Sequence, residues 1–280
     1  MRDVSFGQYY PAKSIVHRMN AAVKILIIIA FIVAVFMVDG KDFHYLGLFA
    51  CALFVIIAII FARVPLGKVL GSIKGIIFFI FLSAVLQLFF NKSGTPLWEG
   101  GFITDQGLLS AGFIIFRITL VVLGASILTL TTSPVELADG IETLMFPLKL
   151  IRFPVHEFAL IMSIALRFIP TLMDETDRII KAQKARGANF ESGNIFKRAK
   201  ALIPVLIPLL IGSFRRADEL ADAMDARCYA GSKKRTKFKK NTFTWGDFFG
   251  MLVVAGLIVG VIFLNKFHLY PYILEWVAMI

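Results

Sequence analysis

Long apolar stretches alternate with short polar connections along most of the chain. A helix needs roughly 20 mainly apolar residues to cross the bilayer core, and charged side chains near its ends can reach the interface. The pattern predicts an all-α integral membrane protein with about five transmembrane helices. Five stretches meet the requirement: Ala21 to Val38, Tyr45 to Ala62, Ile73 to Phe90, Leu108 to Leu130 and Phe248 to Leu264.

Charged residues are kept apart from these stretches. Hydrophobic residues make up 58% of the 280, more than the roughly half that soluble domains contain. The chain nevertheless carries 30 Lys and Arg against 19 Asp and Glu. Nineteen of the basic and twelve of the acidic residues lie between Thr131 and Thr244. This composition excludes an ordinary soluble domain and indicates one large charged insert between the fourth and fifth apolar stretches.

Basic residues mark the connections that we expect in the cytoplasm. The segment up to Lys24 has four basic residues and one acidic residue, and the second connection contains Arg63, Lys68 and Lys74. The first and third connections each carry one net negative charge. By the positive-inside rule, the N-terminus is cytoplasmic.

Three regions follow from this topology. Residues 1–130 form a four-helix transmembrane region, residues 131–244 a cytoplasmic region, and residues 245–280 the last transmembrane helix with an external tail. The end of the tail, Leu269 to Ile280, is too short to span a bilayer. Its Tyr270, Tyr272 and Trp276 are typical of a membrane interface.

Two long elements of the cytoplasmic region each begin apolar and end charged. Phe158 to Leu166 and Ala201 to Ile211 are apolar but shorter than a span, and Pro204 and Pro208 break the second run. The pattern predicts two long helices at or below the membrane surface. Each continues into a charged helical stretch that ends in an arginine: Thr171 to Arg186 and Phe214 to Arg227.

A third, shorter helix opens this region. Ser133 can cap it, Pro134 suits its first turn, and Glu136 completes a capping box. This helix ends before Pro147, while Gly187 supplies the C-terminal stop of the first long helix. The region therefore contributes three cytoplasmic or interfacial helices.

The two long elements end in similar clusters, Ala185-Arg186-Gly187 and Ala226-Arg227-Cys228, whose arginines are 41 residues apart. An arginine between small residues can form a bidentate contact with a carboxylate of another protein. The alternative is that each arginine only complements the negative end of a helix dipole. Two arginines in matched settings favour protein docking.

Four motifs, in this order and spacing, carry a resemblance to a known family. They are Thr131-Thr132-Ser133-Pro134, Leu166-Arg167-Phe168-Ile169-Pro170, Ala182-Gln183-Lys184-Ala185-Arg186-Gly187, and Arg216-Ala217-Asp218-Glu219-Leu220 leading to Ala226-Arg227. Over nearly its whole length the chain resembles the transmembrane T subunit, EcfT, of energy-coupling-factor (ECF) transporters, a branch of the ATP-binding-cassette systems.

The resemblance implies partners and a division of labour. Arg186 and Arg227 would each dock in a groove on one of two ATPase subunits, EcfA and EcfA′, and the two long helices would cross and support an integral membrane substrate-binding S component. ATP and Mg would sit on the ATPases, so this chain would bind no cofactor directly. Cys228 stands where the family commonly has glycine, so the end of the second helix could differ there.

Five further residues are candidates for structural or coupling roles. Arg117 lies near the middle of the fourth stretch, where it either anchors the helix bundle or snorkels to a polar contact. Arg167 precedes the motif's Pro170, and an internal brace or a lipid-headgroup contact suits it better than docking. Asp218 and Glu219 belong to the fourth motif; Asp218 also begins an acidic stripe at Asp218, Asp222 and Asp225 that is typical of a solvated helix face.

Catalytic and nucleic-acid-binding signatures are missing from the sequence. No Gly-x-x-x-x-Gly-Lys-Ser/Thr phosphate loop occurs, and the four histidines have neither metal-ligand spacing nor a nucleophile beside them. Six of the eight residues from Lys233 to Lys240 are basic, which favours contact with anionic membrane lipid over nucleic acid. The chain is therefore not expected to be an enzyme.

The function expected from the resemblance is that of a non-catalytic coupling subunit in a bacterial plasma (inner) membrane importer for a vitamin or another micronutrient. It would transmit the ATP-driven motion of two ATPases to the S component, which selects the substrate. The alternative is a self-sufficient carrier or channel, in which Arg117 and the proline-containing helices line the solute path.

Overall fold

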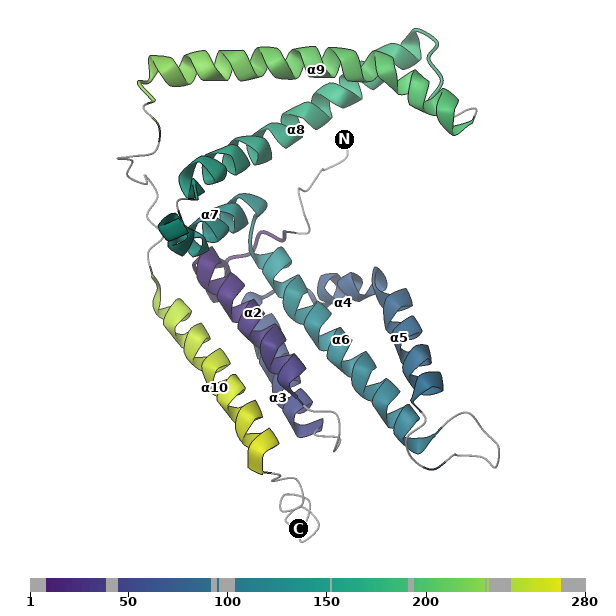
Figure 1. The fold of residues 1–280 in the computed structure, drawn as a ribbon, viewed down its shortest axis with the longest axis vertical. Helices are drawn as coiled ribbons and strands as arrows, with labels where there is room; N and C mark the ends of the chain where they lie inside the picture. The colour runs from purple at the N-terminus through teal and green to yellow at the C-terminus, as the bar shows by residue number, and fades with distance from the viewer. Residues whose placement is uncertain are drawn as a thin grey trace. The chain divides into compact units, whose positions relative to one another are not determined.

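The structure is a computed structural model that describes residues 9–38, 45–91, 95, 104–151, 153–190, 194–229, 231 and 243–267. Within these residues the regular secondary structure is helical, as predicted (Figure 1). The chain divides into two compact units. One combines Gly7–Ile141 with Asn241–Ile280, and the other combines Met1–Phe6 with Glu142–Lys240.

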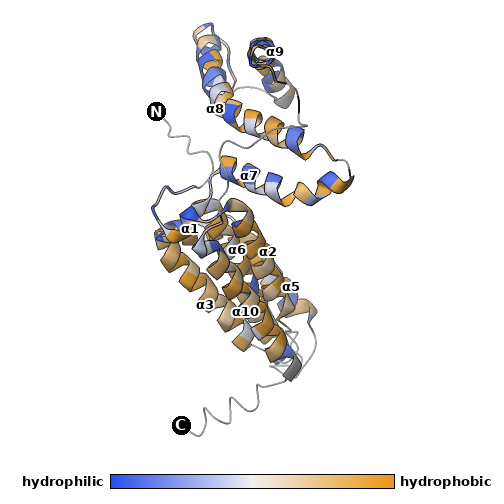
Figure 2. Ribbon diagram, turned by 90° about the vertical axis from the view of Figure 1, so that its left-hand side faces the viewer, coloured by the Kyte–Doolittle hydropathy of each residue, from blue (hydrophilic) through white to orange (hydrophobic). Residues whose placement is uncertain are grey.

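The first unit is a bundle of apolar helices. Helices α2, α3, α6 and α10 lie side by side in it (Figures 1 and 2). Its core gathers residues from all four, among them Phe31, Leu48, Leu120 and Val261. The helices described in this unit are α1 (Ile15–Arg18), α2 (Ala21–Met37), α3 (Tyr45–Ala62), α4 (Leu66–Lys74), α5 (Ile77–Phe90), α6 (Asp105–Thr131), most of α7 (Pro134–Leu144), and α10 (Trp245–Phe267).

The outward faces of these helices are also apolar. On α5 alone, Phe78, Phe81 and Phe90 are each more than 60% exposed. Figure 2 shows that hydrophobic residues predominate along the helices of the bundle, with few hydrophilic ones between them. Contiguous apolar surface of this extent is found where a protein meets lipid or another protein. The unit is therefore the membrane-spanning part of a multi-pass membrane protein.

The predicted third span is shorter than expected. Ile73 and Lys74 belong to α4, and α5 begins only at Ile77, after a bend of 58°. Glycines at 67, 71 and 75 weaken this segment as a helix, and the bend leaves Lys74 outside the apolar helix α5. With 14 residues, α5 is about 21 Å long and falls short of a bilayer core of about 30 Å.

The second unit contains the 3₁₀ helix η1 (Phe146–Ile151) and two long helices, α8 (Val155–Ala185) and α9 (Ile195–Ala226). The predicted break at Pro204 and Pro208 is wrong, because α9 runs through both prolines. The two prolines are exposed, so the carbonyls that they leave without a helical donor can be hydrated.

Helix α8 shows why length does not identify a span in this chain. Like α3, α6 and α10, it is long enough and contains a stretch that is apolar enough to cross a membrane, although only its first half is apolar. Helix α2, with 17 residues, is slightly shorter than these four helices, although its contacts place it inside the bundle. The charged half of α8, from Asp174 onward, distinguishes it from the spans, and its interfacial position stays a prediction.

Buried polar groups join the bundle at the start of α2. Lys24 is only 4% exposed, and its Nζ donates to the Thr131 carbonyl oxygen (3.1 Å) and the Thr132 hydroxyl (3.2 Å) at the end of α6. Asp247 is fully buried, and its two carboxylate oxygens accept from the backbone N–H groups of Asn20 (2.9 Å) and Thr244 (2.7 Å). Helices α2, α6 and α10 are thereby tied together at this end.

The other end of α2 is held in the same manner. The Arg117 guanidinium of α6 donates to the Val38 carbonyl oxygen and lies 4.5 Å from the centroid of the Phe113 ring. From α10, the Asn265 amide donates to the Met37 carbonyl oxygen at 2.6 Å. A helix end leaves carbonyls without partners, and lipid offers none. Of the two sequence interpretations of Arg117, these contacts favour the anchor.

We expect Arg117→Met to lower the free energy of unfolding by about 1.5 to 3 kcal/mol, the usual worth of a hydrogen bond to a charged group. The measurement is a denaturation series in mixed micelles. Arg167→Met removes an exposed arginine of α8 and serves as the matched control, with an expected change within about 0.5 kcal/mol. Equal stability of the two variants would contradict the anchoring role.

Candidate functional site

Helix α8 ends in a Schellman turn that presents Arg186. Gly187 has a φ of +87°, and its N–H donates to the Lys184 carbonyl at 3.0 Å. The Ala188 N–H donates to the Gln183 carbonyl, also at 3.0 Å. These two bonds define the motif, with Arg186 at the C-cap and the left-handed residue directly after it. The predicted helix stop at Gly187 is where the structure places it.

Helix α9 ends in the same turn around Arg227. The Cys228 N–H donates to the Asp225 carbonyl at 2.8 Å, and the Tyr229 N–H donates to the Met224 carbonyl at 3.1 Å. Cys228 has a φ of +56°, a conformation that costs a residue with a Cβ roughly 1–2 kcal/mol. Cys228 therefore adopts the left-handed conformation that the turn requires, at the expense of local strain.

The two arginines occupy equivalent positions and both are exposed. In each turn, backbone N–H groups already bond to carbonyls of the last helical turn. The carbonyls that accept these bonds therefore do not need the guanidinium as a donor. The neighbours Ala185 and Ala226 are small and exposed, which leaves both guanidinium groups accessible to another protein.

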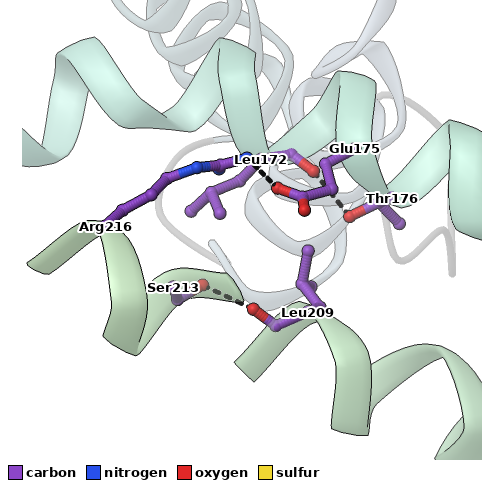
Figure 3. A network of polar contacts seen from close by, with 6 residues as sticks. All are labelled: Leu172, Glu175, Thr176, Leu209, Ser213 and Arg216. Carbon is purple, nitrogen blue, oxygen red and sulfur yellow. Dashed lines mark hydrogen bonds and ion pairs between the residues drawn. The ribbon is translucent and has the colours of Figure 1, made fainter. Parts of the chain in front are cut away.

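Helices α8 and α9 meet at a close contact upstream of these ends. Arg216 of α9 forms an ion pair with Glu175 of α8 (Figure 3). A Cβ on Gly212 would lie 3.1 Å from the Glu175 Oε1 atom, so a glycine permits this close approach. The hydroxyls of Thr176 and Ser213 bond to carbonyls of their own helices at 2.7 Å. The ion pair is therefore the polar link that Figure 3 shows between the helices.

The contact is equally far from both arginines. Glu175 lies 11 residues before Arg186, and Arg216 lies 11 residues before Arg227. At 1.5 Å per residue, each segment is about 16 Å long. The segment of α8 from the contact to Arg186 and the segment of α9 from the contact to Arg227 therefore have the same length. Sequence analysis placed Arg216 in a motif but missed Glu175 and Gly212 as its partners, because only the packing of α8 on α9 brings them together.

The remaining candidates are spread along the two helices. Asp218 and Glu219 are exposed on α9, as are Asp222 and Asp225. Arg167 is exposed on α8, and Pro170 lies within that helix without ending it. The capping box of α7 forms as predicted, with Ser133 and Glu136 exchanging bonds of 3.3 and 3.1 Å. The basic cluster from Lys233 to Lys240 and the tail from Leu269 lie outside the described residues.

In the part of the chain that the structure describes, no three His, Cys, Asp or Glu side chains converge. The one cysteine in the bundle, Cys51, is buried in its apolar core. What the molecule displays instead is a membrane bundle and two exposed arginine turns. Fold and site together define an all-α, multi-pass membrane protein with a second, charged helical unit.

Comparisons with known proteins give the family. The model of a family described as cobalt transport protein (CbiQ) matches residues 12–238. Three relatives are named energy-coupling factor transporter transmembrane protein EcfT. That of Ruminiclostridium cellulolyticum is 45% identical over 92% of this chain and 94% of its own, that of Brevibacillus brevis 46% over 94% and 97%, and that of Listeria innocua 41% over 92% and 98%.

The chain therefore belongs to the CbiQ family, and within it to the energy-coupling factor transporter transmembrane proteins, EcfT. The resemblance drawn from the four motifs is confirmed.

We expect Gly187→Ala to loosen the end of α8, because alanine pays about 1–2 kcal/mol in a left-handed conformation. Amide hydrogen exchange at Ala188 should then become about 5- to 30-fold faster. Cys228→Gly is the reciprocal variant and should slow exchange at Tyr229, since it removes the same strain. If both changes leave exchange unaltered, the two turns do not depend on the left-handed residue.

Proposed function

We propose that the chain is the non-catalytic coupling subunit of an ECF-type importer in a bacterial plasma membrane, with its N-terminus in the cytoplasm. Arg186 and Arg227 each dock on one of two ATP-binding-cassette subunits, which bind ATP and Mg and supply the hydrolysis. The observation that carries this proposal is the pair of identical turns that present the two arginines. The printed names of the relatives support the same class of complex.

The geometry suggests how motion passes through α8 and α9. When the two ATPases approach or separate, they move the ends of α8 and α9. The contact of Glu175 and Arg216 beside Gly212 joins α8 to α9. Displacement of one helix end therefore changes the angle between the two helices, and this moves their other ends as well. Coupling of this kind needs a stiff helix and a fixed crossing, and α8 and α9 have 31 and 32 residues without a break.

The apolar part of α9 offers the receiving surface for an S component. Its large side chains remain exposed, including Leu202, Leu206, Leu210 and Phe214, which follow one another at four-residue intervals. Such spacing places them along one face of the helix. An integral membrane partner that selects a vitamin or another micronutrient would cover this face, and a change in helix angle would tilt that partner.

The contacts of Arg117 argue against the alternative function, a self-sufficient carrier. A solute path through the bundle would use Arg117, the ionisable group near the middle of α6. Arg117 instead donates to the carbonyl end of α2 and packs on Phe113. Its guanidinium is thus committed to holding the bundle together.

We expect Arg186→Glu/Arg227→Glu to abolish co-purification of the two ATPases from detergent-solubilised membranes, and ATP-dependent uptake with it. Like charge would then face the carboxylates that each arginine is proposed to contact. Lys181→Glu/Arg215→Glu is the control, because it makes the same change of charge at exposed positions on the same two helices. Bound proteins are identified by mass spectrometry. Retention of both ATPases by the first variant would refute docking through these residues.

Gly212→Leu separates coupling from docking. The new side chain would meet Glu175 at the crossing, whereas the arginine turns lie more than ten residues away on each helix. We expect the ATPases to co-purify as with the unmodified chain, while uptake falls at least tenfold at unchanged expression. Gly256→Leu is the control, because nothing lies within 4 Å of a Cβ at that position. Full uptake by Gly212→Leu would show that the crossing does not transmit force.

A further inference from the structure

Three basic residues line a pocket at the end of the bundle where α2 begins and α3 ends. Lys13 and Arg18 come from the segment around α1, and Arg63 directly follows α3. The pocket holds about 460 Å³, and all three side chains are exposed. Within the described residues, no carboxylate forms an ion pair with any of them. The pocket therefore has a concentration of positive charge that the described protein does not neutralise.

Arg63 is held in this pocket by an unusual backbone conformation. Its φ is +52°, and its N–H donates to the carbonyls of Ile59 and Ile60 at 3.1 and 3.2 Å. A left-handed arginine costs roughly 1–2 kcal/mol, and residues strained in this way gather at ligand clamps and other functional sites. The turn ends α3 at Arg63, which lines the pocket.

An apolar cavity of about 200 Å³ adjoins the basic pocket. Ile15 and Phe61 line both, so the two spaces share a wall. The cavity runs between α2, α3, α6 and α10, and side chains such as Phe54, Ala58 and Val253 line it. Lys24 and Thr131 supply the polar part of its lining, and they bond to each other. Ile15 and Phe61 are themselves at least half exposed.

We propose that this composite site binds one anionic phospholipid, with its phosphate among Lys13, Arg18 and Arg63 and an acyl chain in the apolar cavity. Unpaired cations beside an apolar space match a molecule that is negative at one end and hydrocarbon at the other. Basic pockets between membrane helices are a known setting for anionic head groups. In the proposed orientation the site opens to the cytoplasmic leaflet. The lipid would fill the space between α1, the end of α3 and the start of α10, and so stabilise this end of the bundle.

The test is native mass spectrometry of the full chain in detergent, titrated with phosphatidylglycerol, phosphatidylcholine or inorganic phosphate. We expect one phosphatidylglycerol to bind with clear preference over phosphatidylcholine. Each basic residue should contribute about fivefold in affinity, so Lys13→Gln/Arg18→Gln/Arg63→Asn should weaken binding of phosphatidylglycerol on the order of 100-fold. Asparagine is chosen at position 63 because it tolerates a positive φ.

Two controls separate this site from general attraction to charge and from an anion site. Lys74→Gln/Lys181→Gln/Lys200→Gln removes three exposed positive charges elsewhere, and it should leave the affinity within about twofold. Ala58→Leu narrows the apolar cavity, and it should weaken phosphatidylglycerol several-fold without a change in charge.

Three results would overturn the proposal. The first is an equal loss of affinity for phosphatidylglycerol in both triple variants, and the second is binding of phosphatidylcholine as tight as that of phosphatidylglycerol. The third is saturation of the site by inorganic phosphate together with no effect of Ala58→Leu on lipid binding. Should the triple variant at the site fail to fold, the exposed single variants Lys13→Gln and Arg18→Gln carry the same test, each with an expected loss of about fivefold.

Discussion

The membrane bundle depends on satisfying the two ends of α2. The outer surface of the bundle is apolar, so in lipid the burial of hydrophobic groups does little to favour one arrangement of the helices over another. Polar groups that lipid cannot solvate make that choice instead. Arg117 and Asn265 occupy the carbonyls at one end of α2, while Asp247 accepts from the backbone at its other end. Because these partners come from α6 and α10, the caps also fix which helices are neighbours.

In the second unit, a polar contact also joins two helices, but it lies in a different place. Helices α8 and α9 are long and largely exposed and contact each other along their sides, so the polar contact lies between their surfaces instead of at their ends. Glu175 and Arg216 are each about 30% exposed, and an ion pair at that exposure adds little stability. The pair adds complementary charge at the place where the packing of α8 on α9 brings the two helices together. Gly212 contributes by allowing the approach, and the equal distances to Arg186 and Arg227 follow from that choice of contact point.

Sequence reasoning succeeded where local rules decide the outcome. The capping box at Ser133, the stop at Gly187 and four of the five helices that were predicted as spans rest on patterns within a few turns of one helix. It failed at the bend after Lys74, because glycines weaken the helix there and a count of apolar residues does not detect this. It also failed at the prolines of α9, because water can satisfy the carbonyls that the prolines leave without a donor, so the helix continues. It also missed Lys24 and Asp247 as structural residues. Both look like ordinary flanking charges, and only contacts more than 100 residues away in sequence bury them.

Cys228 shows how tightly the geometry of the arginine turn is maintained. A cysteine there has no conformational freedom comparable to glycine's, and a helix end without a left-handed residue could finish in several other ways. The turn around Arg227 nevertheless has the same two defining hydrogen bonds as the turn around Arg186. If the arginine served only to complement the helix dipole, any of those other endings would place it near the same carbonyls. Backbone strain is tolerated where the surroundings or a function require a side chain to point in one particular direction. A groove on a partner protein that receives the guanidinium of Arg227 would impose such a requirement.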